Sequence, residues 1–122
     1  MSTASNLIDT HLKIWSDTNR DRRRESINEL YAENCKVYDP FYPDVFVGRD
    51  ALMTLIDEVQ LKFPGFAFSI ISGSLDEHHG AIKLSWFYGP AENPKAITGQ
   101  DFFLIEDDLI SSLYIFIEKL AD

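Results

Sequence analysis

Apolar residues recur at intervals of three or four positions in three segments of the first half of the chain. This spacing predicts amphipathic helices over residues 5–15, 27–34 and 50–63. We expect Asn34 to end the second helix in a left-handed conformation, and we expect Asp50 to cap the start of the third. The first half of the chain is therefore predicted to be mainly helical.

The second half is rich in β-branched and aromatic residues, in runs that are separated by turn sequences. These runs predict strands, and a short run before Pro40 predicts one more. The predicted strands cover residues 35–39, 66–76, 81–88, 96–106 and 109–120. Short connections between the later strands favour an antiparallel meander. Helices followed by a sheet indicate an α+β fold.

Side chains alternate between the two faces of a strand, which sorts the residues of the strand over 96–106. Asp101 shares one face with the apolar Ile97 and Phe103. The opposite face is also apolar, as it is around Tyr114 and Phe116 in the last strand. Because a strand that is apolar on both faces needs cover on both, we expect helices on one side and a second copy of the chain on the other. The pattern predicts a homodimer through the outer sheet face, with Asp101 inside an apolar hollow.

Length, composition and charge restrict the class of protein. The chain of 122 residues fits a single domain over residues 1–122, and its hydrophobic content of 45% is typical of a folded protein. The net charge of −9 argues against nucleic acid and anionic membrane surfaces as partners. Four arginines between residues 20 and 24 interleave with acidic residues, so we interpret this segment as the solvated start of a helix.

Cys35 is the only cysteine, which excludes an intramolecular disulfide and a cysteine-based zinc site. No stretch of the sequence reaches the roughly 18 apolar residues of a membrane span, and the N-terminus lacks the pattern of a secretory signal. We therefore expect a cytoplasmic protein without a membrane anchor.

Three segments carry a resemblance to a known superfamily. Leu30–Phe41, in which Asp-Pro follows a tyrosine, and Gly48–Ala51, which opens a helix, resemble the nuclear transport factor 2-like proteins, particularly ketosteroid isomerases and SnoaL-like polyketide cyclases. Gly99–Phe103 is similar to the strand that carries a second pocket acid in the isomerases. The resemblance implies a cone-shaped α+β fold, in which three N-terminal helices pack on a strongly curved, mostly antiparallel sheet around a cavity.

The resemblance also implies roles for three residues. Asp39 matches the base that removes a proton next to a carbonyl, and Asp101 matches a protonated acid that donates a hydrogen bond to the developing oxyanion. Trp15 stands where the isomerases carry a tyrosine, and its N–H can donate a hydrogen bond but cannot transfer a proton near neutral pH. The implied reaction needs neither a cofactor nor a metal, and the tryptophan argues against steroid isomerisation itself.

An aromatic-rich cavity suits a small, flat, apolar molecule as its partner. The candidate lining residues are Trp15, Phe41, Phe66, Trp86, Tyr88 and Phe103. His11 and His79 are candidates to reach the cavity, with a core histidine and an exposed turn residue as the respective alternatives. Because His78 and His79 are adjacent, their side chains diverge and do not form a natural pair of metal ligands.

The sequence leaves two interpretations of the function open. In the first, the chain is an isomerase- or cyclase-type enzyme with Asp39 as its base. In the second, the same fold binds a ligand without catalysis or serves dimer assembly, and Asp39 caps backbone amides in the turn at Pro40. A carboxyl pKa well above the ordinary value of about 4 would favour the enzyme.

Overall fold

The computed structural model describes residues 3–119. The helices are α1 (Thr3–Ser16), α2 (Arg20–Leu30) and α3 (Arg49–Lys62). The strands are β1 (Tyr31–Tyr38), β2 (Phe46–Val47), β3 (Ala67–Ile70), β4 (Asp76–His78), β5 (Ala81–Gly89), β6 (Ile97–Glu106) and β7 (Leu109–Lys119). Leu120, the end of the last predicted strand, lies outside the described residues. No helix in the described part of the chain is both long and apolar enough to cross a membrane.

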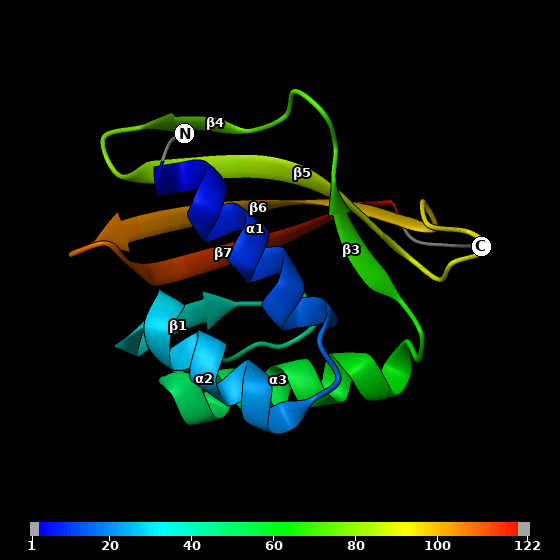
Figure 1. Cartoon of the computed structure of the whole chain (residues 1–122), viewed down its shortest axis with the longest axis horizontal. Helices are drawn as coiled ribbons and strands as arrows, with labels where there is room; N and C mark the ends of the chain where they lie inside the picture. Colours follow the sequence, from blue (N-terminus) through cyan, green and yellow to red (C-terminus); the bar gives the residue numbers. More distant parts are fainter. Residues whose placement is uncertain (1–2, 120–122) are drawn as a thin grey trace.

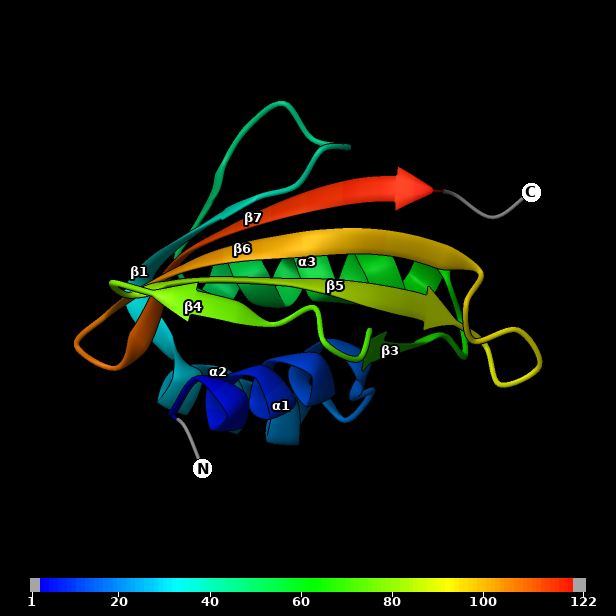
Figure 2. The same cartoon turned by 90° about the horizontal axis from the view of Figure 1, so that it is seen from above.

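The strands form one sheet in the order β2-β1-β7-β6-β5-β3, and β4 pairs with the remaining length of β5. All neighbours run antiparallel except β1 and β7, which run parallel. Helix α1 lies across one face of the curved sheet (Figure 1), and α1 and α2 lie on the same side of it when the molecule is seen from above (Figure 2). The predicted α+β fold, with three helices on a mostly antiparallel curved sheet, is confirmed.

Two predicted helix boundaries are wrong. Helix α2 ends at Leu30, because Tyr31 already has an extended backbone and pairs with β7 as the first residue of β1. Asn34 therefore lies inside a strand and does not end a helix. Helix α3 is capped by Gly48, whose positive φ of 93° suits glycine, and Asp50 lies in the first turn of that helix.

The predicted strand over residues 66–76 is broken into β3 and β4, which both pair with β5. The break is a turn in which Gly73 has a positive φ of 80°. There the Ser74 hydroxyl donates to the carbonyl of Ile71 at 2.7 Å and accepts from the backbone N–H of Ser85 at 3.0 Å. These side-chain bonds replace ladder bonds, so the edge of the sheet bends at this point.

The alternation of inner and outer side chains follows the prediction. Trp86 and Tyr88 of β5 and Asp101 of β6 lie on the buried inner face, whereas Lys83 lies on the exposed outer face. The outer face is apolar but uncovered in the single chain, where its exposed large side chains include Phe102, Leu104, Tyr114 and Phe116.

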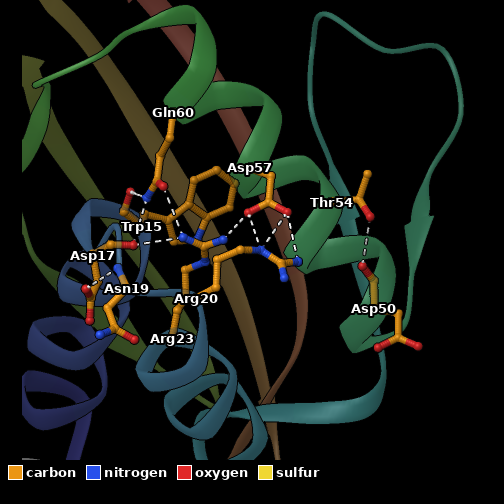
Figure 3. Close-up of polar contacts among 9 residues, drawn as sticks. All are labelled: Trp15, Asp17, Asn19, Arg20, Arg23, Asp50, Thr54, Asp57 and Gln60. Atoms are coloured by element: carbon orange, nitrogen blue, oxygen red, sulfur yellow. Dashed lines mark hydrogen bonds and ion pairs between the residues drawn. The ribbon is translucent and has the colours of Figure 1, made fainter.

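Arg23 corrects the interpretation of the arginine-rich segment as solvated. Its side chain is 0% exposed and forms an ion pair with Asp57 of α3. Its Nη1 also donates to the Gln60 side chain at 3.0 Å and to the backbone carbonyl of Asp17 at 2.9 Å. Gln60 in turn donates to the carbonyls of Trp15 and Asp17 (Figure 3). These contacts, which we call the Arg23 clamp, join the end of α1 to α2 and α3 and so fix the position of Trp15.

Candidate functional site

A cavity of about 70 Å³ lies between the helices and the inner face of the sheet. This volume is several times the roughly 10–15 Å³ that one water molecule requires. The walls are mainly apolar, and polar or ionisable side chains interrupt them. These are His11 and Trp15 of α1, Asp39 and Tyr42 of the loop after β1, Lys62 of α3, Trp86 and Tyr88 of β5, and Asp101 of β6. The cavity therefore combines an apolar surface with two carboxyl groups.

Four buried side chains form a continuous hydrogen-bond network beside the cavity. His11 Nε2 lies 3.0 Å from Asp101 Oδ2, and His11 Nδ1 lies 2.6 Å from the Tyr31 hydroxyl. The indole N–H of Trp15 donates to the same hydroxyl at 3.2 Å. Each of the four residues is at most 5% exposed. In the following, the buried network means these four residues.

Matching the donors and acceptors of the buried network places the proton of His11 on Nε2. A neutral imidazole has one donor and one acceptor nitrogen. If Nε2 carries the proton, it donates to Asp101 while Nδ1 accepts from the Tyr31 hydroxyl, whose oxygen accepts from Trp15. Burial raises the pKa of Tyr31 well above its ordinary value, so that hydroxyl keeps its proton and remains a donor. Every donor in the buried network then has an acceptor, and the chain of donors ends at Asp101.

Three elements position the buried network. His11 and Trp15 lie one turn apart on α1 and therefore project from the same face of the helix. Tyr31 reaches them from the start of β1, and Asp101 reaches His11 from β6. Tyr31 was not predicted as a site residue, because its spacing from Ile27 fits a helix as well as a strand. The structure brings it together with His11, Trp15 and Asp101, which were predicted.

Asp39 lies half-buried at the end of β1 and lines the cavity. Its Oδ1 accepts from the backbone N–H of Phe41 at 2.9 Å, and its carbonyl accepts from the N–H of Tyr42 at 3.1 Å. Burial raises the pKa of Asp39, while the Phe41 N–H and the charge of Lys62 lower it, and the charge of Asp101 raises it. Asp39 thus combines both expected positions, because it caps the turn at Pro40 and also faces the cavity.

Four of the six aromatic residues that we expected at the cavity lie in its wall, and two do not. Trp15, Phe41, Trp86 and Tyr88 line the cavity, and Phe66 and Phe103 do not. The Phe66 ring lies behind Tyr88 at a centroid distance of 5.1 Å, and the Phe103 ring meets His11 edge-on at 4.6 Å. Both side chains support the wall from the core. Further lining residues, which the alternation alone did not single out, include Phe63, Phe68 and Ile117.

Gly99 of β6 makes room for the Trp86 ring. The two residues are paired across β5 and β6. A Cβ atom at position 99 would overlap the Trp86 ring and the carbonyl oxygen of Phe116. The absence of a side chain at this position therefore lets the indole pack closely against β6, where Trp86 forms part of the cavity wall.

The predicted histidine candidates differ in their placement. His11 lines the cavity within the buried network. His79 does not line it: this residue is exposed in the turn between β4 and β5 and has a positive φ of 52°. His78 is exposed beside it, with 3.0 Å between the two Nδ1 atoms. The residues that the structure describes contain no cluster of three or more His, Cys, Asp or Glu side chains that could hold a metal ion.

Fold and site together define a small α+β protein with a mainly apolar cavity between its helices and its sheet. The sequence matches the SnoaL-like domain family over residues 13–113, and the chain belongs to this family. A search of curated protein sequences finds no match. The chain is thus assigned to a family, and it shares the fold of this family over nearly its whole length.

Solved structures with a similar fold cover almost the whole chain. A suggested isomerase of the SnoaL-like family from Agrobacterium tumefaciens has a TM-score of 0.87 and 23% identity, and the match covers 98% of this chain and 100% of that one. A suggested polyketide cyclase from Sinorhizobium meliloti has a TM-score of 0.72 and 13% identity, with coverages of 94% and 99%. A suggested ketosteroid isomerase from Kribbella flavida has a TM-score of 0.72 and 16% identity, with coverages of 98% and 81%. At these identities the similarity establishes the fold.

Proposed function

We propose that this protein is a cofactor-independent enzyme of the isomerase or cyclase type, which abstracts a proton next to a carbonyl group in a small, largely apolar substrate. The observation that carries the proposal is the presence of two carboxyl groups, Asp39 and Asp101, on one mainly apolar cavity. Neighbouring carboxyl groups tend to hold one proton between them, because the charge of one disfavours the charge of the other. Such a pair can supply a base and an acid in the same site.

The surroundings of the two carboxyl groups suggest which one acts as the base. Burial raises the pKa of Asp39, and the Phe41 N–H from which it accepts and the positive charge of Lys62 partly oppose that rise by favouring the carboxylate form. Asp101 accepts from the N–H of His11 at Oδ2, and we give its Oδ1, by the resemblance to the isomerases, the role of donor to the substrate oxygen. In the proposal, Asp39 is the base and Asp101 is the donor to the substrate oxygen.

The proposed reaction starts with transfer of a proton from the α-carbon of the substrate to the Asp39 carboxylate. The electron pair of the broken C–H bond forms the enolate, and Asp101 donates a hydrogen bond to its oxygen. A donor of this kind in a water-excluded site is worth about 3 kcal/mol. In an unsaturated ketone, return of that proton to a carbon conjugated with the enolate gives an isomer. Attack of the enolate carbon on a second carbonyl of the same molecule instead gives a ring, and the proton held by Asp39 passes to the new alkoxide oxygen.

Trp15 has a different part in this proposal from the donor role that the resemblance implied. Its N–H is already engaged by the Tyr31 hydroxyl at 3.2 Å, so it is not free to donate to an enolate. We assign Trp15 and Tyr31 as positioning residues that hold His11, which in turn orients Asp101. Because hydrogen bonds in a chain polarise one another, the network also strengthens the acid at its end.

The test measures deuterium incorporation at the α-carbon of 2-tetralone, a small fused-ring ketone, by NMR. Wild-type protein should accelerate the exchange, and Asp39→Asn should lose about 10²- to 10⁴-fold of the rate. Asp44→Asn, an exposed residue of the same loop, is the matched control and should keep the wild-type rate. Because burial raises the pKa of Asp39 and the base must be ionised, the rate should rise with pH through that raised value. Equal exchange by wild type and Asp39→Asn would show that Asp39 is not the base.

We also propose that two copies of the chain associate through the outer face of the sheet, in the cytoplasmic setting expected from the sequence. Phe116 is 54% exposed there, and Tyr114 stacks on Tyr38 at a centroid distance of 4.2 Å. An open aromatic surface of this kind is more typical of an interface than of a surface in contact with water. Analytical ultracentrifugation should give a dimer for the wild type and a monomer for Phe116→Glu. A wild-type monomer at micromolar concentration would contradict this assembly.

A further inference from the structure

Two polar groups in the cavity wall have no hydrogen-bond partner among the residues that the structure describes. They are the indole N–H of Trp86 and the hydroxyl of Tyr88. Trp86 is 2% exposed and Tyr88 is 3% exposed, so bulk water does not serve them. Folded proteins rarely leave buried polar groups unpaired, because such groups lose their bonds to water without replacement. Each of the two therefore needs a physical explanation.

The described side chains that pack against these two groups are aromatic and offer no acceptor. The Tyr88 ring stacks on Phe68 at a centroid distance of 4.0 Å and meets Phe66 at 5.1 Å. The Trp86 ring meets the edge of Phe68 at 5.0 Å and lies over Gly99. Burial raises the pKa of Tyr88 to about 12, so at neutral pH its hydroxyl keeps its proton and can donate it. The two donors thus share one aromatic part of the wall, and no acceptor for either lies among the residues that the structure describes.

The register of the sheet places these donors away from the proposed reaction centre. Asp101 of β6 is opposite Leu84 of β5, and Trp86 and Tyr88 follow two and four residues further along β5. A strand rises about 3.3 Å per residue, which puts the Cα atoms of Trp86 and Tyr88 about 7 Å and about 13 Å along the strand from the level of Asp101. A ligand that reaches both ends of the cavity would meet a carboxyl group at one end and two neutral donors towards the other.

We propose that Trp86 and Tyr88 form a second hydrogen-bonding site in the cavity, which selects ligands that carry an acceptor oxygen at the end opposite the reacting carbonyl. The substrate class is then a compact, flat ketone with a distal ether, hydroxyl or carbonyl oxygen. The proposal rests on the proposed function only in placing the reacting carbonyl at Asp101. The two donors determine specificity and take no part in the proton transfer.

The first test compares binding of 2-tetralone with binding of 6-methoxy-2-tetralone, in which an ether oxygen lies at the far end of the fused ring from the ketone. Quenching of the fluorescence of the two tryptophans of the full chain reports the dissociation constants. One net neutral hydrogen bond corresponds to about a fivefold difference in affinity. Wild-type protein should bind the methoxy compound about fivefold more tightly than the parent ketone, and Tyr88→Phe should reduce this preference to near unity.

The second test separates a ligand donor from a structural hydroxyl. Removal of a buried hydroxyl that has no partner should leave the ligand-free protein as resistant to urea as the wild type, or more so. Tyr88→Phe should therefore keep or raise the urea midpoint while it loses the methoxy preference. A lowered midpoint in the absence of ligand would show that the hydroxyl is bonded within the folded protein and would overturn the proposal.

The binding tests are independent of catalysis. Asp39→Asn should keep the fivefold preference even though it loses the exchange reaction, so failure of the proposed chemistry leaves this inference standing. Equal affinity of the wild-type protein for the two ketones, or no binding of either at millimolar concentration, would overturn it. A preference that survives Tyr88→Phe would likewise refute the assigned role of this hydroxyl.

Discussion

Replacement of Tyr31 by phenylalanine tests the buried network, because it removes one oxygen atom and leaves the ring in place. That oxygen accepts from the Trp15 N–H at 3.2 Å, and the hydroxyl donates to His11 at 2.6 Å. Both partners stay behind in the variant, and they are only 4% and 2% exposed. The substitution therefore breaks two hydrogen bonds and leaves one buried donor and one buried acceptor without a partner.

The expected loss of stability follows from these two unpaired groups. A buried polar group left without its partner costs about 1–3 kcal/mol, so the two groups together should cost the Tyr31→Phe variant about 2–6 kcal/mol of the free energy of unfolding. With an m-value of about 2 kcal/mol per molar urea, the midpoint of unfolding should fall by roughly 1–3 M. Circular dichroism during urea titration of the purified chain measures this shift.

A matched variant controls for the loss of a tyrosine hydroxyl in general. Tyr42 is half-buried, and its hydroxyl donates to Glu58 at 2.8 Å. Water can replace that bond, so Tyr42→Phe should cost less than about 1 kcal/mol. If Tyr31→Phe instead unfolds within about 0.5 kcal/mol of the wild type, the hydroxyl is not the shared partner of His11 and Trp15, and the proton assignment of the network is wrong.

Three further predictions follow from single residues. Arg23→Ala should lower the free energy of unfolding by about 3 kcal/mol, because it removes a fully buried guanidinium and leaves the partly buried Asp57 and Gln60 without their partner. Arg20→Ala removes a largely exposed partner of the same carboxylate and should have a much smaller effect in the same urea titration. Gly99→Ala should cost about 1–3 kcal/mol and shift tryptophan fluorescence, since the new methyl group must displace Trp86 or the strand; unchanged emission would contradict this. Because burial raises the pKa of Asp39, the folded state binds the proton of the Asp39 carboxyl group more tightly than the unfolded state does. Ionisation of Asp39 above its raised pKa therefore lowers the free energy of unfolding. Asp39→Asn should therefore be more stable than the wild type at pH 7 and equal to it below about pH 4, and identical stability at both pH values would refute the raised pKa.

Local patterns were sufficient for much of the fold. Alternation along the strands predicted the inward position of Asp101, Trp86 and Tyr88, and the outward position of Lys83, because each side chain's face depends only on its neighbours in the same strand. Helical spacing predicted three helices. The same patterns were weaker at boundaries: Tyr31 suited a helix until its pairing with β7 placed it in a strand.

The sequence by itself determined the class of fold, the two inward carboxyl groups and the aromatic character of the cavity. Only the tertiary structure joined His11 to Tyr31 and Asp101, which are 20 and 90 residues apart in the chain. Charge patterning predicted that Arg23 is solvated. In the tertiary structure it is buried, because Asp57 and Gln60 approach it from another helix. The physical reason is the same in both cases. Hydrophobic periodicity fixes the direction of a side chain from its own element, whereas its hydrogen-bond partners depend on how distant elements pack against that element.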